Sequence, residues 1–196
     1  YKAGAVTEVV VPESGVSSYN LTVTNGTGGG VFIQGASVTI TANEPTIGKK
    51  FSGWTIDGIS GLDTTKTSLT FNMPANAVTA TANYEDIEYT ITVNGGTADK
   101  TKAKYGESVT ITANAPATGK EFDKWVVTGI TLSDEDLAKS TVTFEMPASN
   151  VTMEATYKDV IYKVTITNGT TTLDMATYQT EVTVTANEPG DDEYFD

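Results

Sequence analysis

The sequence contains no cysteine, no histidine and no arginine, and it has no long hydrophobic run. Without cysteine the chain has no disulfide and no thiol nucleophile, and without histidine it has no imidazole to serve as a base or a metal ligand. The longest apolar runs extend over only a few residues, for example 9–11, so we expect no transmembrane segment. These absences exclude nucleophilic triads and histidine metal sites.

The charge is strongly one-sided. The 25 acidic residues outnumber the 12 basic ones, all of which are lysine, and the net charge is −13. A surface this acidic repels phosphate backbones, so we expect no nucleic-acid partner. Anionic membrane surfaces are disfavoured for the same reason.

The sequence does contain a repeat with a period of about 70 residues. Residues 19–86 (module 1) read YNLTVTNGT, VTITAN, FSGW and FNMPANAVTATANYED, and residues 89–159 (module 2) follow the same order. Residues 162–196 (the half-module) begin the pattern a third time and stop before the Trp segment. Residues 1–18 are interpreted as the end of a preceding module plus a linker strand at 5–11, so we expect the chain to be part of a longer protein. A fixed period predicts a tandem array.

Each module shows the alternation of half-buried strands. Val38, Ile40 and Ala42 alternate with Thr39 and Thr41, and the same pattern recurs in every block of the repeat. The predicted fold class is therefore mainly β: tandem antiparallel modules of about five short strands, either β-grasp-like or a small two-layer sheet, arranged as beads on a string. The four-residue connections at 85–88 and 158–161 predict semi-rigid joints.

Turns and one helical turn are indicated locally. Asn-Gly pairs tolerate positive φ and favour tight hairpin turns. We predict such turns at Asn25 and Gly26, Asn94 and Gly95, and Asn168 and Gly169. Ser133 followed by three acidic residues predicts one turn of helix in module 2.

The aromatic residues of each module are predicted to form its core. A module of this size needs a large buried side chain, and Trp is the natural centre. The alternative is that the two tryptophans are exposed platforms for sugar rings. The predicted core signature is Trp54, Trp125, Phe51, Phe122, Phe71, Phe144, Tyr84 and Tyr157.

Four blocks, in order and twice over, resemble the divergent internalin B-type repeat of bacterial surface proteins. They are the opening Y-x-[LIV]-T-[VI]-x-[NG]-G-T, the VTITAN strand, F-x-x-W, and the closing F-x-MPA-x-x-V-T-x-x-A-x-Y. The resemblance covers modules 1 and 2 and the first half of a third. It implies β-grasp-like modules in secreted or wall-attached proteins of Gram-positive bacteria, and it implies no catalytic residues.

Two acidic clusters, and one Lys–Asn pair in each module, are candidate sites. Residues 134–136 and the tail at 191–193 lack the spacing of a calcium loop, so solvated acidic turns are the simpler interpretation. Glu135 and Asp136 have no acidic match in module 1, which argues against a catalytic carboxylate pair. We expect no catalytic residue, no cofactor and no metal. Lys49 with Asn43, and Lys120 with Asn114, recur in both modules and could form isopeptide bonds, but the lysines lie in polar Gly-Lys turns.

The sequence predicts a non-catalytic extracellular repeat region that acts as a stalk and possibly as an adhesive part of a cell-surface protein. The alternative is a module that binds a host or cell-wall ligand, a glycan or a protein, through exposed aromatics or sheet edges. An enzyme is the third and most distant hypothesis. We expect a monomer, with strand exchange through the half-module as an option. In one hypothesis the half-module packs against module 2 or against another copy of the chain, through the strand at 5–11; in the other it is simply the remainder of a full repeat.

Overall fold

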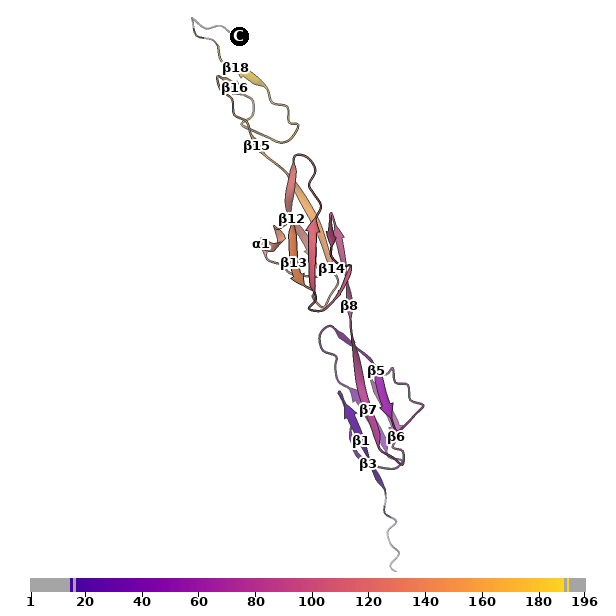
Figure 1. The fold of residues 1–196 in the computed structure, drawn as a ribbon. Coiled ribbons are helices and arrows are strands. Elements are labelled where there is room, and N and C mark those ends of the chain that lie inside the picture. The colour runs from indigo at the N-terminus through magenta and orange to yellow at the C-terminus, as the bar shows by residue number, and fades with distance from the viewer. Residues whose placement is uncertain (1–14, 16, 189, 191–196) are drawn as a thin grey trace, which may run out of the picture. The chain divides into compact units, whose positions relative to one another are not determined.

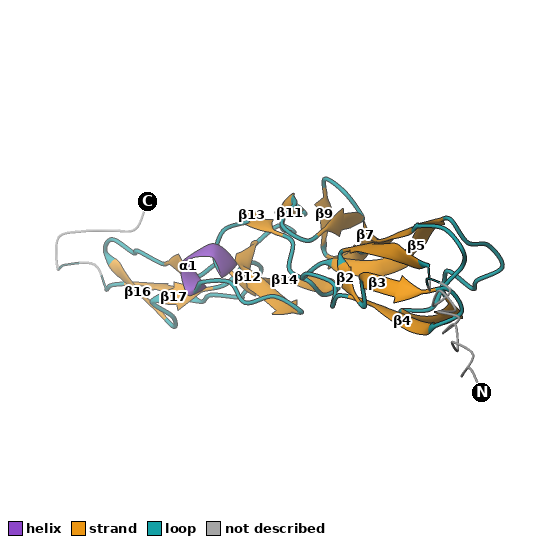
Figure 2. Ribbon diagram, turned by 90° about the horizontal axis from the view of Figure 1, so that it is seen from below, coloured by secondary structure: helices purple, strands orange, loops and turns teal. Residues whose placement is uncertain are grey.

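The computed structural model describes residues 15, 17–188 and 190 and divides the chain into two compact units, residues 1–87 and 88–196 (Figure 1). Strands dominate both units, and the helix in the described part of the chain is the single turn α1 (Asp134–Leu137) (Figure 2). The mainly β fold class is therefore confirmed. The strand expected at residues 5–11 lies outside the described residues.

Module 1 consists of seven strands in two sheets. The larger sheet has the order β3-β1-β7-β5 and the smaller one the order β2-β4-β6. The strands are β1 (Ser18–Thr24), β2 (Gly26–Thr27), β3 (Gly30–Ile33), β4 (Ser37–Ala42), β5 (Lys49–Asp57), β6 (Ser68–Asn72) and β7 (Val78–Asp86).

The alternating residues explain why these strands form two layers. In β4, Val38 and Ile40 are buried, while Thr39 faces solvent and shares a hydroxyl hydrogen bond of 2.8 Å with Thr70 on β6. The buried faces of both sheets meet in one core, to which β1, β4, β5, β6 and β7 all contribute. The apolar face of each sheet thus covers the apolar face of the other sheet, and the faces that carry the threonines remain exposed to solvent.

Module 2 repeats this arrangement with the sheet orders β10-β8-β14-β12 and β13-β11-β9. Its strands are β8 (Glu88–Asn94), β9 (Gly96–Ala98), β10 (Lys102–Lys104), β11 (Ser108–Ala113), β12 (Lys120–Thr128), β13 (Thr141–Glu145) and β14 (Val151–Asp159). The helical turn α1 follows Ser133, whose Oγ accepts a hydrogen bond from the Asp136 amide. The predicted capped turn is confirmed.

The expectation of about five antiparallel strands per module is wrong in two respects. Each module has seven strands, and its first and last long strands are parallel: β1 pairs with β7, and β8 pairs with β14. The short strands β2 and β3 of module 1, and β9 and β10 of module 2, were not expected because two to four residues carry no readable alternation. The parallel pairs were missed because strand direction between distant segments is not encoded in a local pattern.

The Asn-Gly pairs do not close hairpins. Asn25 and Asn168 have φ of 58°, and Gly95 has φ of 71°, so the positive φ is present. However, β1 and β2 belong to different sheets, as do β8 and β9, so these residues carry the chain from one layer to the other. In module 2 the turn is also displaced by one position, because Asn94 is the last residue of β8.

The half-module forms two short strand pairs, β15–β17 and β16–β18. Their bounds are β15 (Tyr162–Lys163), β16 (Gly169–Thr171), β17 (Met175–Ala176) and β18 (Val184–Ala186). Val184 and Met175 are exposed, whereas Ile40 and Ile111, which align with Val184, are buried. Val164, Ile166 and Val182 are only half-buried. The residues that would form the core lack the closing strands that cover them in modules 1 and 2.

Candidate functional site

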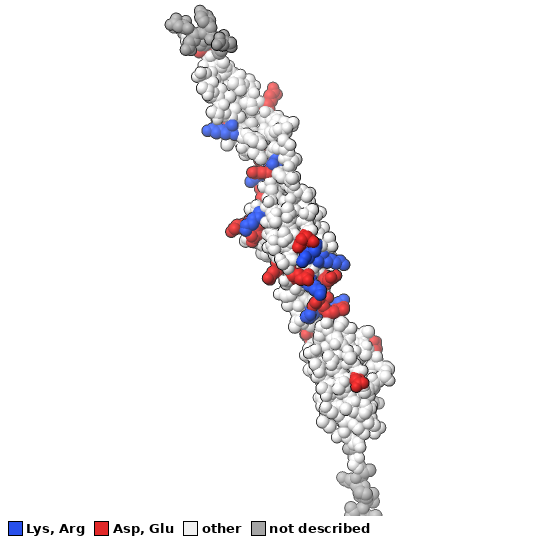
Figure 3. Space-filling view, viewed as in Figure 1, with Lys and Arg blue, Asp and Glu red and all other residues white. Residues whose placement is uncertain are grey.

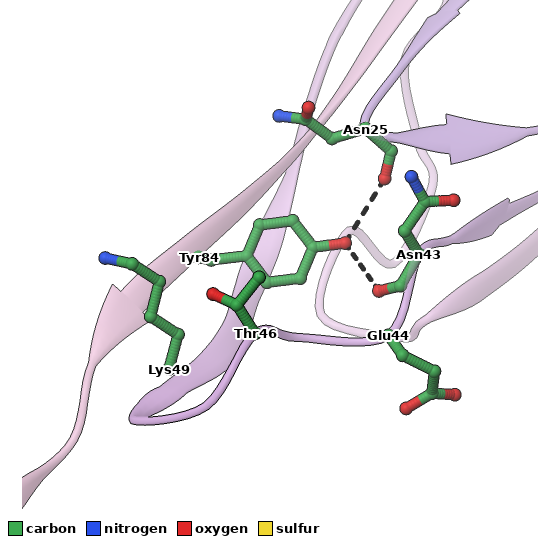
Figure 4. A pocket seen from close by; sticks show the side chains of 6 residues that line it. All are labelled: Asn25, Asn43, Glu44, Thr46, Lys49 and Tyr84. Carbon is green, nitrogen blue, oxygen red and sulfur yellow. Dashed lines mark hydrogen bonds between the residues drawn. The ribbon is translucent and has the colours of Figure 1, made fainter. Parts of the chain in front are cut away.

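A small pocket lies at the end of module 1 where the chain leaves the larger sheet (Figure 4). Its volume is about 220 Å³. The loops after β1 and β4, the start of β5 and the strand β7 supply its walls, which are Asn25, Asn43, Glu44, Thr46, Lys49 and Tyr84. The pocket recurs in module 2 with a volume of about 250 Å³.

The phenol of Tyr84 connects the last strand to two loops at the wall of this pocket. Its hydroxyl lies 2.6 Å from the carbonyl oxygen of Asn43 and 3.2 Å from that of Asn25. The backbone N–H of Asn43 also donates to the backbone carbonyl oxygen of Asn25, at 3.0 Å. A phenol has one hydrogen to donate, so the shorter contact is the stronger bond. Tyr84 therefore ties β7 to the chain that follows β1 and β4.

Tyr157 makes the same connection in module 2. Its hydroxyl lies 2.8 Å from the Asn114 carbonyl oxygen and 3.1 Å from the Gly95 carbonyl oxygen. Each tyrosine ring also lies edge-on to a phenylalanine, Phe51 or Phe122, with ring centroids about 6 Å apart. The feature common to the two pockets is thus structural: a tyrosine, Tyr84 or Tyr157, that links the last strand of its module to two loops, called the staple below.

The ionisable groups of the pocket do not form a repeated catalytic pair. Glu44 lines the first pocket, but Ala115 occupies its place in the second. Lys49 and Lys120 form ion pairs with Asp86 and Asp159 at the end of the last strand. Ligand sites in proteins typically have volumes of roughly 300–1,000 Å³. Both pockets are smaller than this and offer no acid–base pair common to the two modules.

The lysines are not placed for isopeptide bonds. Such a bond needs the amine, an amide and a carboxylate together in an apolar setting, yet both lysine side chains are exposed and paired with aspartates. In Figure 4, Lys49 and Asn43 lie on opposite sides of the Tyr84 ring. The lysines instead join the first residue of one strand to the last residue of its neighbour.

The two tryptophans lie in the cores. Trp54 is 5% exposed and Trp125 is 1% exposed. Their indole N–H groups donate to the Lys66 carbonyl at 3.1 Å and to the Lys139 carbonyl at 3.0 Å. A buried ring with a satisfied N–H has no face to offer a sugar, so the platform alternative does not hold. Phe71 and Phe144 are also buried, and Phe51, Phe122, Tyr84 and Tyr157 are half-buried.

Gly26, expected only as a turn residue, and Gly96, not expected to have a role, both pack against the tryptophans. A Cβ at Gly26 would lie 2.7 Å from the Trp54 ring, and one at Gly96 would lie 2.8 Å from the Trp125 ring. The same Cβ atoms would meet the carbonyl oxygens of Thr41 and Thr112. The recurrence of G-T at this point of each module was the available signal. It marks close approach of backbone and ring as well as a turn.

The acidic cluster of module 2 is engaged within the helical turn. Lys139 donates to Asp136 at 2.8 Å and lies 3.2 Å from Glu135. The hydrogen bonds from Lys139 and Ser133 lower the pKa of Asp136, and the bonds to Asp136 and Glu135 raise the pKa of Lys139. Acidic and basic side chains are interspersed on the visible face of this module (Figure 3). Across the described residues, no group of three or more acidic side chains is arranged to hold a metal ion. The tail at 191–193 lies outside them.

The match to a family model decides the identity of the repeat. The model for the divergent InlB B-repeat domain matches residues 19–88 and again 89–161. The chain belongs to the divergent InlB B-repeat family. The resemblance noted in the sequence is confirmed. Membership of this family indicates a bacterial surface repeat region, and the family is typically non-catalytic. No curated protein matches the chain. Within the described part of the chain, no helix is long and apolar enough to cross a membrane.

Proposed function

We propose that these InlB B-repeats form a non-catalytic stalk that spaces another part of a Gram-positive surface protein from the cell wall. The observation that carries the proposal is the position of the two ends of each module. The chain enters module 1 at Ser18 and leaves it at Asp86, and the two strands concerned run in the same direction. Each module therefore advances the chain instead of returning it to its starting point.

The advance per module follows from the strand register. Leu21 pairs with Val78, and Ser18 and Asp86 lie three and eight positions beyond this pair in opposite directions. At about 3.3 Å per residue, the ends are separated by about 35 Å along the strands. The register Ile91 with Val151 gives the same offset in module 2. One residue, Ile87, separates β7 from β8, and its amide donates to the Gly48 carbonyl. The connection between modules 1 and 2 is therefore very short.

Small-angle X-ray scattering on the full chain tests the proposal. A compact globule of this length has a radius of gyration of about 16 Å. Modules that each advance the chain by about 35 Å give a value of about 25 Å or more. A radius of gyration near the compact value, independent of salt and concentration, would contradict the stalk.

Adhesion to a partner protein is the second candidate, and one sheet edge favours it. The edge strand β3 of module 1 exposes Val31 and Ile33, at 69% and 50%. The corresponding edge strand β10 of module 2 carries Lys102 and Lys104, and the amide of Lys104 donates to the Glu107 carboxylate at 2.9 Å. Lysines and a capped amide are the usual protection of an edge strand, and module 1 has Ala36 where module 2 has Glu107. Module 1 therefore offers the edge to which an extended segment of a partner can add.

A transplant of the protected edge tests the second candidate. The triple variant V31K/I33K/A36E gives module 1 the edge of module 2, and K102A/K104A is the control on the other module. Binding to immobilised host or cell-wall protein fractions should fall in the triple variant and not in the control. Equal binding by the triple variant and the unaltered chain would exclude β3 as the adhesive edge.

A further inference from the structure

The strands that enter and leave each module are direct neighbours. Leu21, Thr22, Val23 and Thr24 of β1 are paired in parallel with residues 78–81 of β7, and Figure 1 shows the two strands side by side. In module 2, residues 91–94 of β8 are paired in the same way with residues 151–154 of β14. Any tension along the chain must therefore pass through these two pairs.

We propose that the β1–β7 and β8–β14 pairs are mechanical clamps that resist stretching of the stalk. The inference rests on the proposed function, because only a spacer held at both ends experiences such tension. Parallel neighbours pulled from their opposite ends slide past one another, so all the bonds between them are strained together. Antiparallel neighbours would have both loaded ends on one side and would separate one bond at a time.

The clamps lie where water cannot easily replace their hydrogen bonds. β1 and β7 are the two inner strands of a four-stranded sheet, flanked by β3 and β5, and β8 and β14 hold the same positions between β10 and β12. Leu21, Val78 and Ala80 at the clamp are buried in the core. Breaking these bonds exposes apolar surface and unpaired backbone groups at the same moment.

Side chains lengthen the clamp at a different end in each module. In module 1, the Asn25 amide group donates to the Ala82 carbonyl at 3.1 Å, just beyond the last paired residues. In module 2, Gly95 occupies the place of Asn25, and the Asn150 side chain accepts from the Thr90 amide at 2.8 Å, just before the first paired residues. Ala77 holds the corresponding place in module 1. These two side-chain bonds differ between the modules, whereas the tyrosine contacts to the Asn25 and Gly95 carbonyls recur in both.

Single-molecule force spectroscopy in two pulling directions tests the clamp. The chain has no cysteine, so handles can be attached at introduced pairs. N20C with E85C pulls module 1 from opposite ends of β1 and β7, whereas N20C with A77C pulls the two strands apart from the same end. All three positions are exposed, and both variants retain Trp54 as a fluorescence check of folding.

The expected unfolding force is higher in the first direction by a factor of about two to four, because four paired positions share the strain there and one carries it in the second. In module 2, pulled from its two chain ends, N150A should lower the force, while E154A on the exposed face of β14 should leave it unchanged. Equal forces in the two directions would overturn the clamp. A compact particle in scattering with unequal forces would refute the stalk and leave the clamp standing.

Discussion

Replacing Trp125 by alanine should unfold module 2 and leave module 1 intact. The indole is 1% exposed and contacts Phe122, with ring centroids 5.6 Å apart. Truncation of a buried Trp costs about 3–5 kcal/mol. It also leaves the Lys139 carbonyl without the indole N–H that now bonds it, which adds about 1 kcal/mol or more if water cannot enter. A module of about 70 residues has a total stability of about 4–10 kcal/mol. The loss therefore consumes most or all of the stability of module 2.

The assay uses the fact that each module has one tryptophan. In W125A the remaining indole, Trp54, reports on module 1 alone, and urea denaturation followed by its fluorescence should give the same midpoint as in the unaltered chain. Circular dichroism should show the loss of about half of the cooperative β signal. W54A is the matched control, with the roles of the modules exchanged. An unchanged melt of module 2 in W125A, or simultaneous loss of both modules, would refute the view that each module closes its own core.

Four further outcomes are expected. Y157F should destabilise module 2 by roughly 0.5–1.5 kcal/mol, because the Asn114 carbonyl loses a donor, and Y84F should do the same to module 1; no change in either urea midpoint would contradict the staple. K139A should raise the pKa of Asp136, measured by NMR titration. Because that pKa is lowered in the folded state, the ionised Asp136 stabilises the fold above the ordinary aspartate pKa. This stabilisation is lost as the pH falls through the lowered value. A chelator should leave thermal melting unchanged, and a shift of several degrees would revive a calcium site. Deletion of residues 162–196 should leave a stable monomer if the half-module is only a remainder, whereas exposed apolar surface or a changed oligomeric state would show that it packs on module 2 or on another copy.

Much of each module was readable in the sequence because its cause is local. Val38 and Ile40 alternate with threonines, and this alternation alone tells which side of β4 faces the core. Ser133 and the acids after it produce the capped turn α1 through bonds within four residues. The repeat itself indicated that modules 1 and 2 have the same fold. The family match extends over the same two copies.

The features that bear on function depend on contacts between distant residues. Burial of Trp54 and Trp125, rather than their exposure as sugar platforms, depends on Gly26 and Gly96 approaching the rings from the opposite sheet. The Asn-Gly segments were read as hairpins because a positive φ permits a tight turn; the next strand instead pairs in the other layer.

The parallel pairing of β1 with β7 is the feature that lies furthest from any local sequence pattern. Leu21 and Val78 carry the same alternation whether their strands run parallel or antiparallel. Alternation specifies the face of a strand and nothing about its neighbour. The direction and order of the strands depend on which arrangement lets one short chain cover the apolar faces of both sheets at once. That choice places the ends of each module on opposite sides, and it is the physical basis of the stalk and clamp proposed here.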